Sequence, residues 1–313
     1  MNKPALRRLR APLPLIASVC LLFVALTVLS SLMMPKNNQA SFGQHDVGAH
    51  GVLGEPQNSL DVLFVGDSEV YTSLIPRQMW SEHGFTSYDV STSAQKLPYA
   101  YSLLQRALAR QQPRVVVLET NMLFRRVDVD DALWRTLADA LPVLEYHNRW
   151  KSLRPVDISA PVKTTWTDPS KGANLSDATV PSSTSGYMKP SQERAAVARL
   201  NRWYLERIVD LCQSQGAEVV LLSTPSTKNW NWERHNAVEA LIAEHANWNH
   251  VTYLDLNLHR EEVPIDWSCE SRDGGDHLNR SGAEKVSRFV GAWLDERYQL
   301  PDHRDDPSYR TWM

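Results

Sequence analysis

Short, continuous apolar runs alternate with amphipathic segments along the chain after residue 60. The apolar runs predict strands over 62–65, 87–90, 115–118, 219–222 and 251–256. Runs rich in β-branched residues are typical of strands covered on both faces, and strands that alternate with helices imply parallel βαβ units. We therefore expect an α/β protein, with a three-layer α/β/α sandwich around a mostly parallel sheet.

Apolar residues recur at helical spacing between these runs. The spacing predicts helices over 97–108, 130–141 and 197–211, and a last helix from about 281 to 293. Gly216 stands at the C-cap position of the third helix. Ser281 and Glu284 have the spacing of a capping box that opens the last helix.

The N-terminal segment is apolar over 13–34 and follows a cluster of four basic residues, Lys3, Arg7, Arg8 and Arg10. About twenty such residues span a bilayer, and basic residues stay on the cytoplasmic side. A cleaved signal peptide is the competing interpretation, but the run is longer than a typical signal core and no clear Ala-x-Ala site follows. We expect a cytoplasmic tail over 1–12, an uncleaved signal anchor over 13–34, and an extracytoplasmic domain held at the cell membrane.

Two further segments differ from the alternating pattern. Residues 35–58 are polar and rich in Gly, Asn and Gln, which predicts a linker before a single domain over 59–313. Residues from about 150 to 190 are rich in Pro, Ser, Thr, Lys and Asp and show little periodicity. Irregular segments of this length are usually functional or disordered, so we expect an insertion over or beside the active face.

Composition excludes several classes of function. The formal net charge of −3 gives no electrostatic reason to bind nucleic acid. The three cysteines, Cys20, Cys212 and Cys269, form neither a disulfide framework nor a Cys-x-x-Cys metal motif. We expect no metal and no cofactor.

Candidate chemistry begins where the first predicted strand ends, in Gly66-Asp67-Ser68. A tight polar turn after a buried strand presents its side chain at the edge of the sheet, where α/β proteins bind ligands. Ser68 is therefore a candidate nucleophile, and it requires a base. An ordinary β-turn into a helix is the alternative interpretation.

The candidate base is His277, which ends the segment Asp273-Gly274-Gly275-Asp276-His277. An imidazole base needs a carboxylate that fixes its tautomer. We favour Asp273 over Asp276, because the two glycines let the loop fold Asp273 back towards the ring, whereas adjacent side chains usually diverge. A solvated loop or a metal-binding loop remains the alternative.

Taken together, residues 65–71, 118–121, 226–230 and 273–282 resemble the SGNH/GDSL hydrolase superfamily, in its order and over nearly all of 60–295. More narrowly, the chain resembles the membrane-anchored extracytoplasmic branch related to the DltD proteins of teichoic-acid alanylation. The resemblance implies a flavodoxin-like sheet, a Ser68-His277-Asp273 triad, and ester or acyl-transfer chemistry. It also implies an oxyanion hole formed by the N–H groups of Ser68 and Ala94 and by Asn121, with Ala94 where the superfamily usually has glycine.

Lys228, Asn229 and Trp230 follow the strand predicted over 219–222, on the same edge of the sheet as Ser68. Tryptophan and asparagine at such a rim suit a sugar or lipid-linked substrate, through stacking and hydrogen bonds. Structural tryptophans that anchor a loop are the alternative.

These observations predict a membrane-anchored serine esterase or O-acyltransferase. Its expected substrates are acyl esters of envelope polysaccharide or teichoic acid, and a membrane-bound partner protein could donate the acyl group. The alternative is a non-catalytic envelope protein that uses the same scaffold to bind or hand over a polymer.

Overall fold

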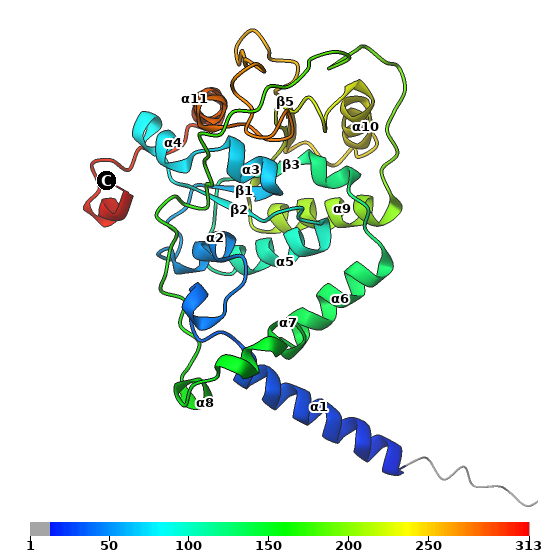
Figure 1. The fold of residues 1–313 in the computed structure, drawn as a ribbon, viewed down its shortest axis with the longest axis vertical. Helices are drawn as coiled ribbons and strands as arrows, with labels where there is room; N and C mark the ends of the chain where they lie inside the picture. The colour runs from blue at the N-terminus through cyan, green and yellow to red at the C-terminus, as the bar shows by residue number, and fades with distance from the viewer. Residues whose placement is uncertain (1–12, 313) are drawn as a thin grey trace, which may run out of the picture.

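A five-stranded sheet forms the centre of the protein in a computed structural model that describes residues 13–312 (Figure 1). The strands are β1 (Val62–Gly66), β2 (Ser87–Ser91), β3 (Val115–Glu119), β4 (Glu218–Ser223) and β5 (Val251–Asp255). All five predicted strands are confirmed, because each observed end lies within one residue of the expected one.

The strands are parallel and follow the order β2-β1-β3-β4-β5. This is the flavodoxin-like order, in which the direction of chain winding reverses between β1 and β3. Ligands of such sheets bind outside the carboxyl ends of the strands beside this switch point. Ser68 is two residues beyond the end of β1, so the fold places it at that point.

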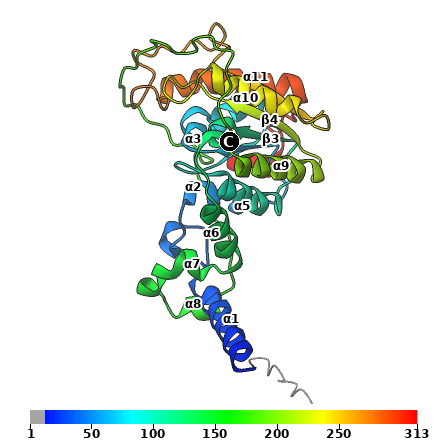
Figure 2. The same ribbon diagram turned by 90° about the vertical axis from the view of Figure 1, so that its right-hand side faces the viewer.

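Helices cover both faces of the sheet and complete the expected three layers (Figure 2). Leu63 and Val65 of β1 join the core cluster that contains α5 (Leu97–Leu108) and α9 (Arg199–Ser214). Val62 and Phe64 point to the other cluster. That cluster contains residues of α3 (Ser68–Ser73), α4 (Pro76–His83) and α11 (Arg280–Tyr298), and α10 (Trp232–Ala243) packs beside the edge strand β5.

The predicted helices are confirmed, with corrections at α9 and α11. The C-cap of α9 is Gln215, not Gly216, which follows it with a φ of +75°. Asn279, not Ser281, is the N-cap of α11, and its side-chain oxygen accepts from the N–H of Gly282 at 3.3 Å. Ser281 lies inside the first turn and donates to Glu270 at 2.8 Å. Asn279 has an extended backbone and a side-chain acceptor of its own, so the helix starts two residues earlier than the capping-box pattern indicates.

Helix α1 (Leu13–Met33) projects away from the body of the protein (Figures 1 and 2). Within residues 13–312, it is the one helix that is long and apolar enough to cross a membrane, with a mean hydropathy of 2.5 over Pro14–Met33. Its apolar side chains are largely exposed. The predicted basic tail over 1–12 lies outside the described residues.

The segment expected as a linker is instead folded against the edge of the sheet. It contains the short helices η1 (Ala40–Phe42), α2 (Val47–His50) and η2 (Gly51–Gly54). Ala49 and Val52 are buried in the core, and the hydroxyl of Tyr88 in β2 donates to the carbonyl of Gly48 at 2.8 Å. These few apolar residues are spaced too irregularly to be recognised in the sequence, but they cover the edge strand β2.

The irregular region expected near 150–190 has two parts. The first, after α6 (Val129–Ala140), contains α7 (Val143–Tyr146), η4 (His147–Ser152) and α8 (Val156–Ser159) beside the end of α1. The second, residues 160–198, has neither helix nor strand and leads to α9. We call it the strap. The short helix η5 (Pro307–Trp312) follows α11.

Candidate active site

Ser68 is the first residue of α3 and lies directly beyond the carboxyl end of β1. Asp67 is the N-cap of this helix and accepts from the N–H of Glu69 at 2.9 Å. A side chain at Gly66 would overlap Val70 and Glu119, so the turn requires glycine there. These local contacts fix Ser68 at the start of α3, where 8% of its surface is exposed.

The structure brings Ser68, His277 and Asp273 into one line of hydrogen bonds. His277 Nε2 lies 2.7 Å from Ser68 Oγ, and His277 Nδ1 lies 2.5 Å from Asp273 Oδ2. With the Nδ1 proton donated to the carboxylate, Nε2 is free to accept the proton of the serine hydroxyl. This is the arrangement that a serine nucleophile requires.

Asp273 folds back onto the histidine as the two glycines predict. Its Oδ1 accepts from the backbone N–H of His277 at 2.9 Å and of Asp276 at 3.2 Å. Burial acts in the opposite direction, but the hydrogen bonds from His277 prevail and hold the pKa of Asp273 below its usual value. Asp276 Oδ2 is 3.8 Å from the same ring nitrogen, so it is the more distant of the two carboxylates.

The loop that carries these residues is braced from two sides. Ser226, after β4, donates to the carbonyl of Gly275 at 3.0 Å. On the other side, the strap runs along the loop, where the N–H of Val180 donates to the carbonyl of Ser271 at 2.8 Å. Gly275 has a φ of +105°, and a side chain there would overlap Ser182 of the strap. The strap therefore helps to fix the position of the base.

A cluster of buried carboxylates lies next to Ser68, and its central member, Glu69, is not among the residues expected at the site. Glu69 accepts from Asn229 at 2.8 Å and from the hydroxyl of Thr224 at 2.8 Å. Burial and the nearby charge of Asp67 outweigh these hydrogen bonds and raise the pKa of Glu69 to about 8. Glu69 therefore keeps its proton to a higher pH than an ordinary glutamate does.

Glu119 has the same character. Burial and the charges of Asp67 and Glu69 raise its pKa well above its usual range. Its Oε1 accepts from the N–H of Asn121 at 2.6 Å, whereas Oε2 has no hydrogen-bond partner within residues 13–312. The third carboxylate, Asp67, is paired with a cation, because Arg125 Nε donates to its Oδ2 at 2.7 Å. Asp67 and Glu69 are neighbours at the start of α3, but Glu119 comes from the end of β3, so no short-range sequence pattern identifies the whole cluster.

Asn121 belongs to the same cluster. Its side chain contacts these residues, whereas the sequence predicts a place for it in the oxyanion hole. Its amide nitrogen lies 3.2 Å from Asp67 Oδ2 and 3.2 Å from Glu69 Oε1. Its carbonyl oxygen accepts from Arg234 at 2.7 Å. The whole side chain is thus committed to carboxylates and an arginine, because buried charges need partners.

The three residues expected to bind substrate lie beside the loop from Asp273 to His277, but they contact protein. Lys228 Nζ donates to the carbonyl of Asp273 at 2.9 Å, and Asn229 donates to both Glu69 and Asp276. Trp230 is 3% exposed and donates to Asp255 at 2.9 Å. It is a structural tryptophan, so it offers no free face for stacking. Lys228 remains at the rim.

Ala94 adopts a left-handed conformation with a φ of +50°. Glycine adopts this conformation without strain, whereas the Cβ of alanine makes it less favourable, so the surrounding structure holds Ala94 in it. The neighbouring Ser93 hydroxyl lies 2.8 Å from that of Tyr71 in α3. Tyr71 is three residues after Ser68 and shares its helix face, so this loop lies beside the nucleophile.

A hollow of about 320 Å³ opens beside this loop. It runs between the loop and α6, and its lining includes Ser93, Ala94, Lys96, Asp131 and Trp134. The indole of Trp134 is exposed, and Lys96 pairs with Asp131 at 2.8 Å. An aromatic face next to polar groups is the kind of surface that holds a sugar ring.

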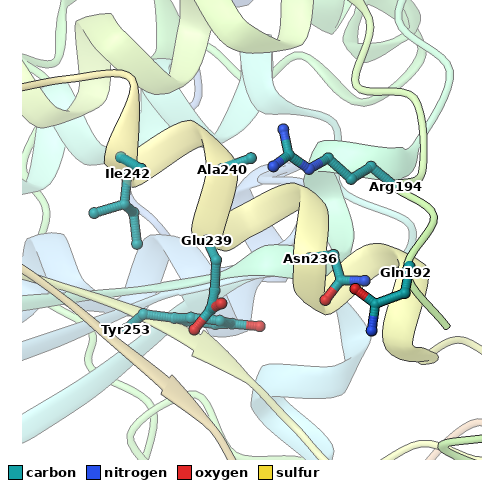
Figure 3. Close-up of a pocket in the computed structure, with 8 residues that line it drawn as sticks. Gln192, Arg194, Asn236, Glu239, Ala240, Ile242 and Tyr253 are labelled. Carbon is teal, nitrogen blue, oxygen red and sulfur yellow. The ribbon is translucent and has the colours of Figure 1, made fainter. Parts of the chain in front are cut away.

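A second hollow, of about 530 Å³, lies between α10, β5 and the strap (Figure 3). Gln192, Arg194, Asn236 and Glu239 border it, and none of the Ser68-His277-Asp273 set lines it. Behind it, His235 Nδ1 lies 2.8 Å from Asp255 Oδ2. The other nitrogen of this ring lies 3.6 Å from Glu239, and within residues 13–312 no serine is hydrogen-bonded to this second Asp-His pair through the ring.

Metal ligation was the alternative interpretation of the catalytic loop. Ligand atoms of Asp273, Asp276 and His277 do lie within 4.8 Å of one another. However, the two ring nitrogens of His277 are occupied by Asp273 and Ser68. The imidazole is therefore oriented for proton transfer with Ser68 and has no nitrogen free to hold an ion.

Comparison with known proteins gives likeness in structure only. No protein-family model matches the chain, and no curated protein sequence matches it. Among solved structures, it is similar to a lipase/acylhydrolase from Enterococcus faecalis, with a TM-score of 0.42, 10% identity, and coverage of 78% of this chain and 98% of the other.

Two carbohydrate esterases are similar to the same degree. A family 3 carbohydrate esterase from Clostridium thermocellum gives a TM-score of 0.40 and 11% identity, covering 77% of this chain and 97% of the other. An acetyl xylan esterase gives 0.40 and 14%, covering 74% and 98%. Likenesses at this level do not assign a family, so the function is inferred below from the site itself.

Proposed function

We propose that the protein is a serine esterase or acyltransferase that works through an acyl-enzyme on Ser68. The observation that carries this proposal is the continuous contact from Ser68 Oγ to His277 Nε2 and from His277 Nδ1 to Asp273, at 2.7 and 2.5 Å. Its position at the carboxyl end of β1, beside the switch point of the sheet, supports the proposal.

In the first half of the reaction, Ser68 Oγ attacks the carbonyl carbon of the ester while its proton passes to His277 Nε2. Asp273 stabilises the resulting imidazolium. When the tetrahedral intermediate collapses, the bond to the leaving alcohol breaks and His277 returns the proton to that alcohol. The acyl group is then bound to Ser68 as an ester.

In the second half, water or a sugar hydroxyl attacks the acyl-enzyme. His277 takes the proton of the incoming nucleophile and returns it to Ser68 Oγ as the new ester or acid leaves. Hydrolysis and transfer differ only in which hydroxyl enters. The hollow beside Ala94, with the exposed indole of Trp134, supports a sugar as acceptor or as carrier of the acyl group.

For the oxyanion we propose the backbone N–H groups of Ser68 and Ala94. The left-handed conformation of Ala94 and the contact between Ser93 and Tyr71 support this assignment. A preorganised donor of this kind contributes about 2.7–4 kcal/mol to lowering the barrier. We leave Asn121 out of the oxyanion hole, because its amide faces Asp67 and Glu69.

We further propose that α1 anchors the enzyme in the cell membrane with its catalytic domain outside the cytoplasm. Its 21 residues, apolar and exposed, support a single span. An enzyme held there acts on polymers of the envelope, such as acylated polysaccharide or teichoic acid, and a membrane-bound protein could supply the acyl group.

Labelling with a fluorophosphonate, which reacts with activated serines, tests the catalytic proposal on the full chain in detergent. We expect the wild type to be labelled and Ser68→Ala and His277→Ala to be unlabelled. Ser73→Ala, which changes another serine of α3, should label as the wild type does. An unlabelled wild type would instead favour the non-catalytic polymer-binding alternative.

A further inference from the structure

Several exposed apolar side chains lie on the segments beside the end of α1 and have no role in the proposed chemistry. They lie on η4, α8 and the first residues of the strap, which together with α7 we call the collar (residues 143–163). Its large exposed apolar residues are Trp150, Leu153, Val156, Ile158 and Val162. Ile158 is 73% exposed and Trp150 is 63% exposed. Such a concentration on one short segment requires an explanation.

The collar is fixed to the end of α1 by direct contacts. The guanidinium of Arg149 is buried and donates to the carbonyl of Met33, the last residue of α1, at 2.5 Å. The same guanidinium donates to Asp157 of α8 at 2.9 Å. Nearby, the hydroxyl of Ser30 accepts from the N–H of Val143 at 3.2 Å. Both views place α7 and α8 beside this end of the helix (Figures 1 and 2).

The length of α1 sets the depth at which the collar lies. At 1.5 Å per residue, 21 residues extend about 31 Å, close to the thickness of a bilayer's hydrocarbon core. If α1 spans that core, Met33 lies at its outer boundary. The apolar cluster of Met33, Val143 and Tyr146 extends to Leu26, about 10 Å deeper along the helix. The collar must then lie at the membrane surface or within it.

The charges of the collar fit a lipid surface. Its exposed charged residues between 147 and 163 are all cationic, namely Lys151, Arg154 and Lys163. The one acid in that stretch, Asp157, is buried and paired with Arg149, and the collar's other acid, Glu145, is paired with Arg135. Segments that lie in a membrane interface combine cationic side chains with Trp, Leu and similar apolar residues.

We infer that the collar is a second membrane-contacting element, whose apolar side chains enter the outer leaflet while its cations face anionic headgroups. This inference rests on the proposed membrane span. Two contacts with the bilayer, instead of one, would hold the catalytic domain in a fixed orientation above the membrane. A single helix followed by a flexible linker would leave it free to rotate.

Fluorescence quenching by brominated lipids tests the inference on the full chain in vesicles that contain anionic phospholipid. Cys20→Ala and Cys269→Ser leave only the buried Cys212, and a bimane label is placed by Ile158→Cys. Val129→Cys, at the far end of α6 and also 73% exposed, is the matched control. Val24→Cys reports the span itself. Hydrolysis of a chromogenic ester by each labelled protein reports the active site separately.

We expect Ile158→Cys and Val24→Cys to be quenched several-fold more than Val129→Cys. If Val24→Cys is quenched and Ile158→Cys behaves as Val129→Cys does, the collar lies outside the bilayer and the inference is wrong, although the span stands. If neither is quenched, both the span and the collar are wrong. Ester hydrolysis should proceed in all three proteins, so its loss would concern the catalytic proposal alone.

Discussion

The side-chain amide of Asn229 donates to Glu69 and to Asp276. One amide therefore joins the residue that follows the nucleophile to the residue that precedes the base. Asn229 comes from the loop after β4, between these two segments of the site. A change in the protonation of Glu69 would alter its hydrogen bond with Asn229. Because Asn229 also holds Asp276, that change would reach the loop that carries His277.

We predict that the protonation of Glu69 affects stability in a definite range of pH. Its pKa is about 8 in the folded protein against 4.5 for an ordinary glutamate. Between these values the folded state binds more protons than the unfolded state, so stability should fall as pH rises from about 4.5 to about 8. Glu69→Gln, which is neutral at every pH, should remove this part of the decrease.

Thermal unfolding of the full chain in detergent, measured across this range, checks the prediction. The exposed Glu261→Gln serves as control and should keep the wild-type slope. An unchanged slope in Glu69→Gln would show that Glu69 is ionised in the fold.

Glu69→Ala should lower activity more than Glu69→Gln, because it leaves Asn229 and Thr224 without their partner.

The two carboxylates near His277 should differ strongly in their effect on turnover. Asp273→Asn removes the acceptor that fixes the tautomer of the imidazole, and by analogy with serine triads it should lower kcat by about 10⁴-fold. Asp276→Asn should cause a far smaller loss, because Asp276 is 3.8 Å from the ring nitrogen. Steady-state hydrolysis of a chromogenic ester measures both, and equal losses would contradict the assignment of Asp273.

Ala94 should tolerate glycine and reject a branched side chain. Ala94→Gly keeps the N–H and fits the φ of +50° without strain, so kcat should stay near the wild-type value. Ala94→Val should lose activity, because a β-branched residue resists this conformation. The control is Ala173→Val in the strap, which should leave hydrolysis unchanged. Wild-type activity in Ala94→Val would remove Ala94 from the oxyanion hole.

Gly275 should be required for activity because the strap packs against it. Gly275→Ala introduces a side chain that overlaps Ser182 and Thr227, at a φ of +105°. We expect the loop from Asp273 to His277 to shift and kcat to fall. Gly186→Ala, with a φ of +78° and no atom within 4 Å, should cost about 1–2 kcal/mol of stability and leave kcat unchanged. Equal effects on kcat would mean that the strap does not position the base.

The sheet and the set of Ser68, His277 and Asp273 could be predicted from the sequence, because each has a local pattern in it. The strands appear as continuous apolar runs, Ser68 as a polar turn after the first of them, and Asp273 as a carboxylate separated from His277 by two glycines. Ser68 and His277 lie close together although they are far apart in the sequence, because the carboxyl ends of parallel strands lie at the same edge of the sheet.

What the sequence did not reveal depends on neighbours that are distant in the chain. Trp230 has the composition of a sugar-stacking residue, and only its burial against Phe124 and its bond to Asp255 identify it as structural. Asn121 was expected at the oxyanion because nothing local indicates that Glu69 and Arg234 would take its amide. The folding of residues 35–58 could not be predicted for a similar reason, because this segment contacts β2 and Lys171 of the strap, which are distant in the sequence.

The order of the catalytic residues along the chain has a consequence for biosynthesis. Ser68 enters the fold with the first strand, whereas His277 comes after the last strand, 209 residues later. A chain that is still being synthesised therefore carries its nucleophile long before the group that activates it. In the proposed mechanism, Ser68 becomes reactive only when nearly the whole domain has been made and folded, so a nascent chain would not be acylated.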